Sequence, residues 1–140
     1  MNQNSPQIPA EPQGFLTGRV STAGGAVPLE GAAVNIRGGN VDDSSVIYAL
    51  TTNSDGLTPT VSLPTPPRSA SQTPQDTTPA YAVYNVDVFA KGYSPAFFNN
   101  VPIFEGINSV QPAILLPEIE NSPYDNSQYV TETPNGGDYL

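Results

Sequence analysis

Short runs in which apolar and polar residues alternate constrain this chain most, because successive side chains of a β-strand point to opposite faces of a sheet. The clearest run is AYAVYNVDVFA at residues 80–90, where Tyr84, Val86 and Val88 share one face. No segment has the period of a helix, and 16 prolines with 12 glycines are too many turn formers for a helical protein. The chain is therefore predicted to be all-β.

Seven short strands are expected, with turn signals between them. They are GFLTGRVST (14–22), AAVNIRG (32–38), SVIYALTT (45–52), TPTVSLP (58–64), AYAVYNVDVFA (80–90), AFFNNVPIF (96–104) and SVQPAILLP (109–117). A single sheet of this size would leave an apolar face in water, so two antiparallel sheets should pack as a sandwich. The residues expected in its core are Val34, Ile36, Tyr84, Val86, Val88 and Ile114.

The two ends differ from the middle in composition. Residues 1–13 are polar and proline-rich, and residues 118–140 are acidic and have no period. The predicted organisation is an N-terminal arm (1–13), one sandwich domain (14–117) and a polar tail (118–140). Within the domain, the low-complexity segment 64–79 is predicted to be a long surface loop.

The charge and the missing residue types exclude several functions. Thirteen acidic residues against four basic ones give a net charge of −9, which repels nucleic acid and anionic membranes. The sequence has no Cys and no His, so disulfides, thiolate nucleophiles, imidazole bases and His-ligated zinc are excluded. Nothing in the pattern brings two carboxylates into one pocket, and no Gly-x-Ser-x-Gly turn occurs. We therefore expect no enzyme activity, catalytic residue, cofactor or metal site.

The acidic residues most suggestive of a ligand site lie in turns. Asp42 and Asp43 are adjacent in a loop, and Asp55 lies in the NSDG turn. Such residues usually cap turns through their side chains, and calcium binding is the alternative. Asp87 is expected on the exposed face of its strand, paired with Arg19 or Arg37.

Neither a secretory signal nor a membrane span is visible. The first 13 residues lack a basic region and an apolar run, and no segment approaches the ~20 apolar residues of a spanning helix. We expect a soluble protein that reaches an extracellular, cell or spore surface without a classical signal peptide.

Several fragments occur in a recognisable order. They are GRV at 18–20, AVPLEGAAVNI at 26–36, TTNSDGL at 51–57, LP at 63–64, YNVDV at 84–88 and KGY at 91–93. In this order the sequence resembles the carboxypeptidase regulatory-like domain, a transthyretin-like seven-stranded sandwich. Residues 91–117 resemble the N-terminal sandwich of clostridial spore cortex-lytic and peptidoglycan-binding proteins. The resemblance implies the fold and a spore or wall context but no activity, because the lytic modules do not follow here.

Lys91, the only lysine, is a candidate for covalent chemistry. Collagen-adhesin repeats with this sandwich form a Lys–Asn isopeptide bond from a lysine on the first strand. Here the first strand carries Arg19, and Lys91 follows the fifth strand in a Gly-Tyr turn. Lys91 is therefore predicted to be a solvated turn residue, with Tyr93 packed against the sandwich edge.

Candidate interface residues are aromatic or lie in the two ends. One phenylalanine of AFFNN, Phe97 or Phe98, should point outward. Tyr129 and Val130 anchor the β-capable segment SQYVTET of the tail, and Ile8 lies between prolines in the arm. Open sheet edges accept added strands, so either end could dock on a neighbouring subunit.

Three functions remain open. The first, which we favour, is a self-assembling structural subunit of an extracellular or spore-surface fibre, a homo-oligomer linked through its terminal arms. The second is a monomeric adaptor that binds cell wall or carbohydrate. The third is an accessory module beside a separate lytic enzyme, and a phage structural protein would look the same.

Overall fold

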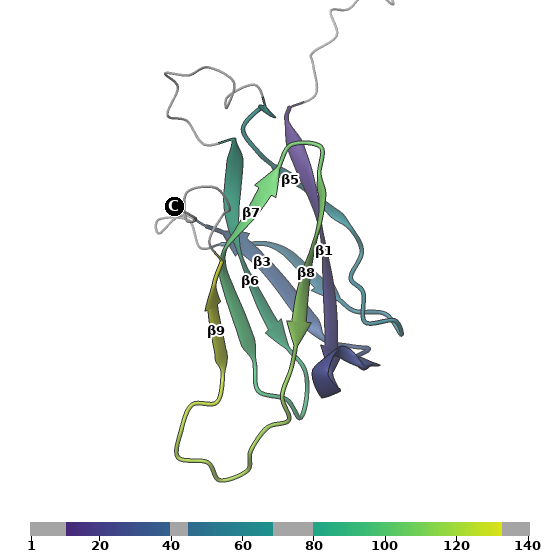
Figure 1. Cartoon of the computed structure of the whole chain (residues 1–140), viewed down its shortest axis with the longest axis vertical. Helices are drawn as coiled ribbons and strands as arrows, with labels where there is room; N and C mark the ends of the chain where they lie inside the picture. Colours follow the sequence, from purple (N-terminus) through teal and green to yellow (C-terminus); the bar gives the residue numbers. More distant parts are fainter. Residues whose placement is uncertain (1–10, 40–44, 69–79, 133–140) are drawn as a thin grey trace, which may run out of the picture.

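The computed structural model describes residues 11–39, 45–68 and 80–132, which form a sandwich of two β-sheets (Figure 1). Its strands are β1 (Gln13–Thr22), β2 (Val27–Pro28), β3 (Ala33–Gly38), β4 (Val46–Thr51), β5 (Val61–Pro64), β6 (Tyr81–Phe89), β7 (Ala96–Phe104), β8 (Asn108–Ile114) and β9 (Gln128–Thr131). A 3₁₀ turn, η1 (Ala23–Gly25), lies between β1 and β2. The all-β sandwich is confirmed, but the described part has nine strands rather than seven.

The four-stranded sheet is built around β1. This strand pairs antiparallel with β2 and β5, and parallel with β8 along residues 15–21. The expectation of purely antiparallel sheets is therefore wrong. Between β1 and β8 the chain forms four strands of the second sheet, β3, β4, β6 and β7, and a parallel pair needs a long connection of this kind.

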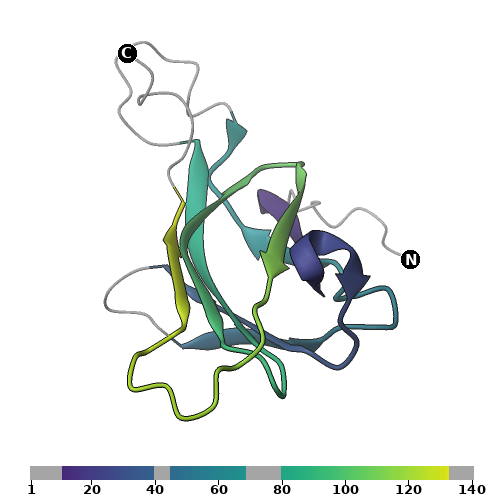
Figure 2. The ribbon, with the colours of Figure 1, turned by 60° about the horizontal axis from the view of Figure 1, so that its bottom comes forward.

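The five-stranded sheet has the order β4-β3-β6-β7-β9. Its first four strands pair antiparallel, and β9 adds to β7 in the parallel direction. Figure 2 shows β9 at the rim of this sheet, reached by the loop that runs from β8 in the other layer. The segment SQYVTET of the tail thus contains a strand, and that strand completes its own sheet.

The core lies between the two sheets. Five of the residues expected there are buried, namely Val34, Ile36, Tyr84, Val86 and Val88. On β3 every second residue is buried, and on β6 Tyr84, Val86 and Val88 are buried together with Asp87, which lies between two of them. Tyr84 also donates a hydrogen bond to the Pro64 carbonyl, so its hydroxyl is satisfied beside the core.

Ile114 was expected in the core, and this prediction is wrong. Its side chain is 43% exposed, whereas Ala113 and Leu115 on either side are buried. The segment 113–116 is continuously apolar, so either phase of the alternation fits the sequence. Pairing with β1 selects the phase, because Ala113 lies opposite the inward-facing Val20.

The NSDG turn forms as expected. Gly56 has φ +77°, and a Cβ there would lie 2.4 Å from the Val20 carbonyl oxygen, so only glycine fits. Asn53 does not adopt positive φ and contributes to the turn through its side chain. Its Oδ1 accepts hydrogen bonds from the amides of Asp55 and Leu57, at 2.9 and 3.0 Å.

Candidate binding face

We call the solvent-facing side of the five-stranded sheet the outer face. Polar and aromatic side chains from several of its strands lie together on this face. Register places Asn35 of β3, Asp87 of β6 and Phe97 of β7 side by side, and Tyr129 of β9 follows Phe97. Because residues two apart on a strand share a face, the residues two positions before and after each member of this row also lie on the outer face.

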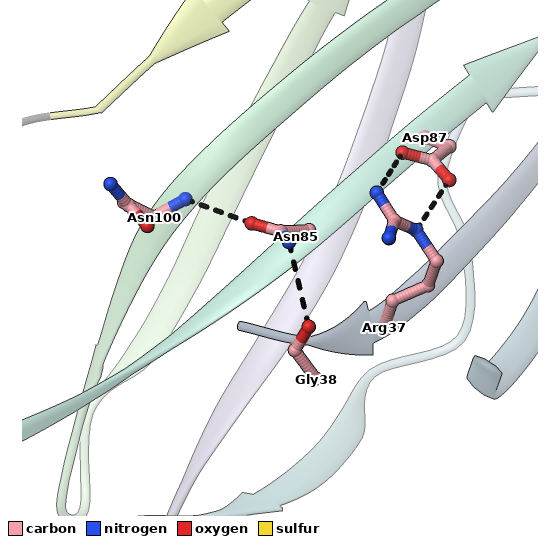
Figure 3. A network of polar contacts seen from close by, with 5 residues as sticks. All are labelled: Arg37, Gly38, Asn85, Asp87 and Asn100. Atoms are coloured by element: carbon pink, nitrogen blue, oxygen red, sulfur yellow. Dashed lines mark hydrogen bonds and ion pairs between the residues drawn. The ribbon is translucent and has the colours of Figure 1, made fainter. Parts of the chain in front are cut away.

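An ion pair occupies the centre of the outer face. Arg37 Nε and Nη2 donate to the two carboxylate oxygens of Asp87, at 2.7 and 3.1 Å (Figure 3). This fork-to-carboxylate geometry is the strongest form of the pair. The hydrogen bond to Asp87 raises the pKa of Arg37 above its usual value.

The ion pair corrects part of the sequence prediction. Of the two arginines expected as partners of Asp87, Arg37 forms the ion pair. Arg19 lies on β1 in the other sheet. Asp87 was expected to be exposed, yet it is only 8% exposed. Its cross-strand neighbours Asn35 and Phe97 stand on either side, so the carboxylate lies below the surface of the face.

A β-bulge adds an amide cluster next to the ion pair. The register of β6 and β7 shifts between Tyr84 and Val86, so Asn85 faces both Asn99 and Asn100. Asn100 has φ +61°, a conformation that asparagine tolerates better than most residues. Asn85 Oδ1 accepts a hydrogen bond from the backbone N–H of Asn100 at 3.1 Å. Asn85 Nδ2 donates to the Gly38 carbonyl at 3.5 Å (Figure 3). We call Arg37, Asn85, Asp87 and Asn100 the polar centre.

Aromatic rings border the polar centre on one side. Phe89 meets Phe97 edge to face, with ring centroids 5.7 Å apart. Phe97 and Tyr129 stack with centroids 5.2 Å apart and planes 17° from parallel. These three residues form the aromatic row, and Tyr129 at its end is 65% exposed. At the opposite end of β6 and β7, Tyr81 and Phe104 form a second aromatic contact with centroids 5.6 Å apart.

The aromatic row also holds β9 in place. Beside the stack of Tyr129, Val130 packs partly buried against the core. Gln128 Nε2 donates to the Ile114 carbonyl at 2.9 Å, which ties β9 to the last residue of β8. Asp125 accepts from the Ser127 amide at 3.0 Å and from the Tyr129 hydroxyl at 2.8 Å. The bond to Ser127, with that to Tyr129, lowers the pKa of Asp125.

The predicted interface residues are separated by the fold. Phe97 points outward into the aromatic row, but Phe98 is 6% exposed and belongs to the core, so its assignment to an interface is wrong. Alternation along β7 requires this division. Tyr129 and Val130 lie on β9 within the same chain, and Ile8 lies outside the described residues.

Lys91 and Asp55, which were considered for covalent and metal chemistry, both lie in exposed turns. Lys91 is exposed in the turn after β6, and Tyr93 packs against the core as predicted. Asp42 and Asp43 lie outside the described residues, and Asp55 is exposed in its turn. Among residues 11–39, 45–68 and 80–132, no group of three or more acidic side chains could hold a metal ion. The absence of a catalytic residue, cofactor and metal stays a prediction.

In the part of the chain that the structure describes, no helix has the length and apolar character needed to cross a bilayer.

Sequence reasoning identified Phe97, Tyr129 and Asp87 but not their grouping. Phe89, Asn85 and Asn100 were not predicted as interface residues. The doubled asparagine of AFFNN was the available signal, because asparagine in a strand marks a bulge or a break.

The fold and the outer face define a β-sandwich module with an amide- and aromatic-lined sheet surface. No protein-family model and no curated protein matches the sequence. Among solved structures, the Bacillus anthracis TIE protein is 17% identical with a TM-score of 0.48, covering 75% of this chain and 16% of that chain. A DUF3823 family protein from Parabacteroides merdae is 13% identical with a TM-score of 0.48, covering 77% and 48%. The chain spans less than half the length of either protein, and both similarities are too weak to assign a family.

Proposed function

We propose that the chain is a non-catalytic adaptor that binds carbohydrate on the outer face. The observation that carries the proposal is the junction of the aromatic row with the polar centre. Sugar rings offer C–H groups that pack on the electron-rich faces and edges of aromatic rings, and hydroxyls that need both donors and acceptors. The outer face supplies rings from Phe89, Phe97 and Tyr129 and amide groups from Asn35 and Asn85 within one set of paired strands.

The polar centre is already fixed before a ligand arrives. Arg37 and Asp87 hold each other, and Asn85 is held by Asn100 and Gly38. Groups that are immobilised in the free protein lose little conformational entropy on binding, which favours affinity for weakly interacting ligands. The face is also open along its strands, so it suits an extended polymer better than a small enclosed molecule.

Charge favours a neutral polysaccharide. The net charge is −9, yet the nine strands carry only Arg19, Arg37 and Asp87 as charged residues. The other acidic residues in the described part of the chain lie outside the strands, and the net negative charge repels anionic polymers from a distance. Because Arg37 is neutralised by Asp87, the outer face offers no free cation to attract them.

The test is electrophoresis of the full chain through gels that contain a neutral polysaccharide. Hydroxyethyl cellulose, mannan and a soluble chitin derivative are suitable probes, with carboxymethyl cellulose as the anionic counterpart. We expect retardation by at least one neutral polymer and weaker retardation by the anionic one. Phe89→Ala should remove the retardation, and Tyr124→Ala, a 78% exposed tyrosine outside the outer face, should not. Equal behaviour of the two variants, or no retardation by any neutral polymer, contradicts the proposal.

A second candidate function is self-assembly through the terminal arms. The observation that favours it is the attachment of β9, which uses only four residues and follows a long loop. A strand held by so short a pairing can exchange with that of a second copy, and exchange that does not close produces an open chain. Size measurement at rising concentration and salt, comparing the full chain with residues 14–117 and 1–117, tests this function. Equal assembly of all three forms excludes the arms as connectors.

The proposed function also includes a family and a location for the protein. The ordered fragments GRV, AVPLEGAAVNI, TTNSDGL and KGY support a transthyretin-like, carboxypeptidase regulatory-like sandwich. Residues 91–117 support the resemblance to the sandwich of clostridial spore cortex-lytic proteins. A neutral-glycan adaptor or fibre subunit fits an extracellular, cell-wall or spore-surface location. Co-sedimentation with purified bacterial wall sacculi would test the wall as partner, and the Phe89→Ala variant is the control.

A further inference from the structure

A second pair of aromatic rings lies at the other end of β6 and β7 from the aromatic row. Tyr81 and Phe104 stand opposite each other in the register of these strands, with ring centroids 5.6 Å apart and planes 52° from parallel. Ala82 packs against the core and Ile103 is fully buried, so alternation turns Tyr81 and Phe104 to the outer face. We call Tyr81 and Phe104 the distal pair.

The strand β6 carries one line of outward side chains from the aromatic row to the distal pair. Tyr81 and Phe89 are its first and last residues, so about 26 Å of extended strand separates them. Asp87 and Asn85 of the polar centre follow Phe89 along this line, and Val83 comes next. The line follows the twist of the strand, and a chain of sugar rings can follow the same path because it rotates at each glycosidic link.

The part of the outer face near the distal pair suits an uncharged ligand. Val83 pairs with Pro102, which adds an apolar step between the polar centre and the distal pair. At the end of β7, the Glu105 carboxylate accepts the backbone N–H of Arg68 at 2.6 Å, and the Glu105 carbonyl accepts Arg68 Nη2 at 3.0 Å. The positive and negative side chains at this end therefore lie together, as those of the polar centre do.

We propose that the distal pair is a second ring-binding subsite, so that one neutral polysaccharide chain lies along β6 and β7 and contacts both groups of rings. This inference rests on the proposed binding of carbohydrate by the outer face. It adds a length requirement, because a trisaccharide reaches one group of rings, whereas a chain that spans about 26 Å reaches both.

The two groups of rings act on the same bound chain. Once the chain is held at the aromatic row, its contact with the distal pair forms within the same complex and adds affinity without a second loss of translational freedom. The amide groups of the polar centre lie between the rings and meet the hydroxyls of the middle sugar units. The protein should therefore prefer long chains to short oligosaccharides of the same sugar.

The test compares the trisaccharide and the hexasaccharide of three neutral series, built from β-1,4-linked glucose, mannose or N-acetylglucosamine. Isothermal titration calorimetry with the full chain gives the ratio of their association constants. In the series that binds, we expect the hexasaccharide to bind about tenfold more tightly or better. Tyr81→Ala should bring the ratio close to one, whereas Tyr81→Phe, which keeps the ring, and Tyr124→Ala, outside the outer face, should retain it. Because the ratio is taken within one variant, a loss of folded protein does not imitate the effect.

NMR spectra of the ¹⁵N-labelled full chain provide an independent readout. The hexasaccharide should shift the amide signals of Val83 and Phe104 together with those of Phe97, and in Tyr81→Ala only the shifts at Phe97 should remain. A ratio near one in the wild type, or equal ratios in the wild type and Tyr81→Ala, overturns the second subsite and leaves the proposed function standing. If no neutral oligosaccharide or polymer binds the wild type, both proposals fail.

Discussion

At Asn100 the chain adopts a backbone conformation that few residues accept, and the outer face is built around it. The positive φ lets β7 carry one residue more than β6, which turns the Asn100 amide toward Asn85. A β-branched residue in this conformation costs about 1–3 kcal/mol, whereas glycine has no such cost.

We expect Asn100→Gly to retain or slightly raise the free energy of unfolding and Asn100→Val to lower it by about 1–3 kcal/mol. Urea denaturation followed by circular dichroism measures both. If the valine variant is as stable as the glycine variant, the bulge does not constrain position 100 as described.

The Arg37–Asp87 pair should stabilise the fold as well as order the face. Asp87→Ala leaves a half-buried guanidinium without its carboxylate and should lower the free energy of unfolding by about 1–3 kcal/mol. The Arg37→Ala and double variants complete a double-mutant cycle. A coupling energy near zero would show that the two side chains act independently.

Tyr84 makes stability depend on alkaline pH. Burial raises the pKa of its phenol above the usual value of 10. Since the folded pKa lies above the unfolded one, the contribution is complete below pH 10 and is lost as the pH rises through the folded pKa. The midpoint temperature of the wild type should fall across this window more steeply than that of Tyr84→Phe, which has no phenol to ionise. Parallel pH profiles would rule out this role for Tyr84.

At the scale of the element, β9 depends on a few contacts made by side chains. Tyr129→Ala removes the stack on Phe97 and the hydrogen bond to Asp125. We expect β9 to detach and the neighbouring β7 amides to exchange faster, while the core formed by β3 and β6 stays protected. Tyr124→Ala is the matched control. Unchanged exchange in β7 would mean that other contacts hold β9.

Acid should loosen the same element. The pKa of Asp125 is lowered by its bonds to Ser127 and Tyr129, so its contribution is present above the usual value of 3.8 and is lost as the pH falls through the depressed pKa. Asp125→Asn should remove this acid dependence from the Tyr129 ring signals in NMR spectra. If the ring signals of Asp125→Asn still move in acid, another group is responsible.

The elements also show how far the sequence predicts the fold. Alternation on β3 and β6 identifies their inward faces, because Asn35 and Arg37 on β3 and Asn85 and Asp87 on β6 fall between the inward apolar residues. In β8 the apolar run 113–116 allows two phases, and only the parallel pairing with β1 decides between them. β9 has four residues and little hydrophobicity, so its place depends on the tertiary contacts of Tyr129 and Val130. The sequence predicted single residues of the outer face, such as Phe97 and Tyr129. That these residues lie side by side follows from the register of the strands.

At the scale of the whole molecule, the two sheet surfaces differ in character. The outer face of the five-stranded sheet combines the polar centre with aromatic rings. A groove beside the four-stranded sheet is lined by Arg19, Asp55 and Ile114, among others, and none of its lining residues is aromatic. If the chain binds a neutral glycan, these two surfaces are the alternatives, and the rings favour the first.

NMR titration of the ¹⁵N-labelled full chain with the neutral oligosaccharide of the best-binding polymer tests the account most directly. Carbohydrate binding on the outer face should produce shifts that cluster at Asn35, Asp87, Phe97 and Tyr129, with the Asn85 side-chain amide among the largest. These shifts should saturate and should vanish in Phe89→Ala. Shifts confined to the groove around Arg19 and Asp55, or shifts that remain in Phe89→Ala, would contradict it.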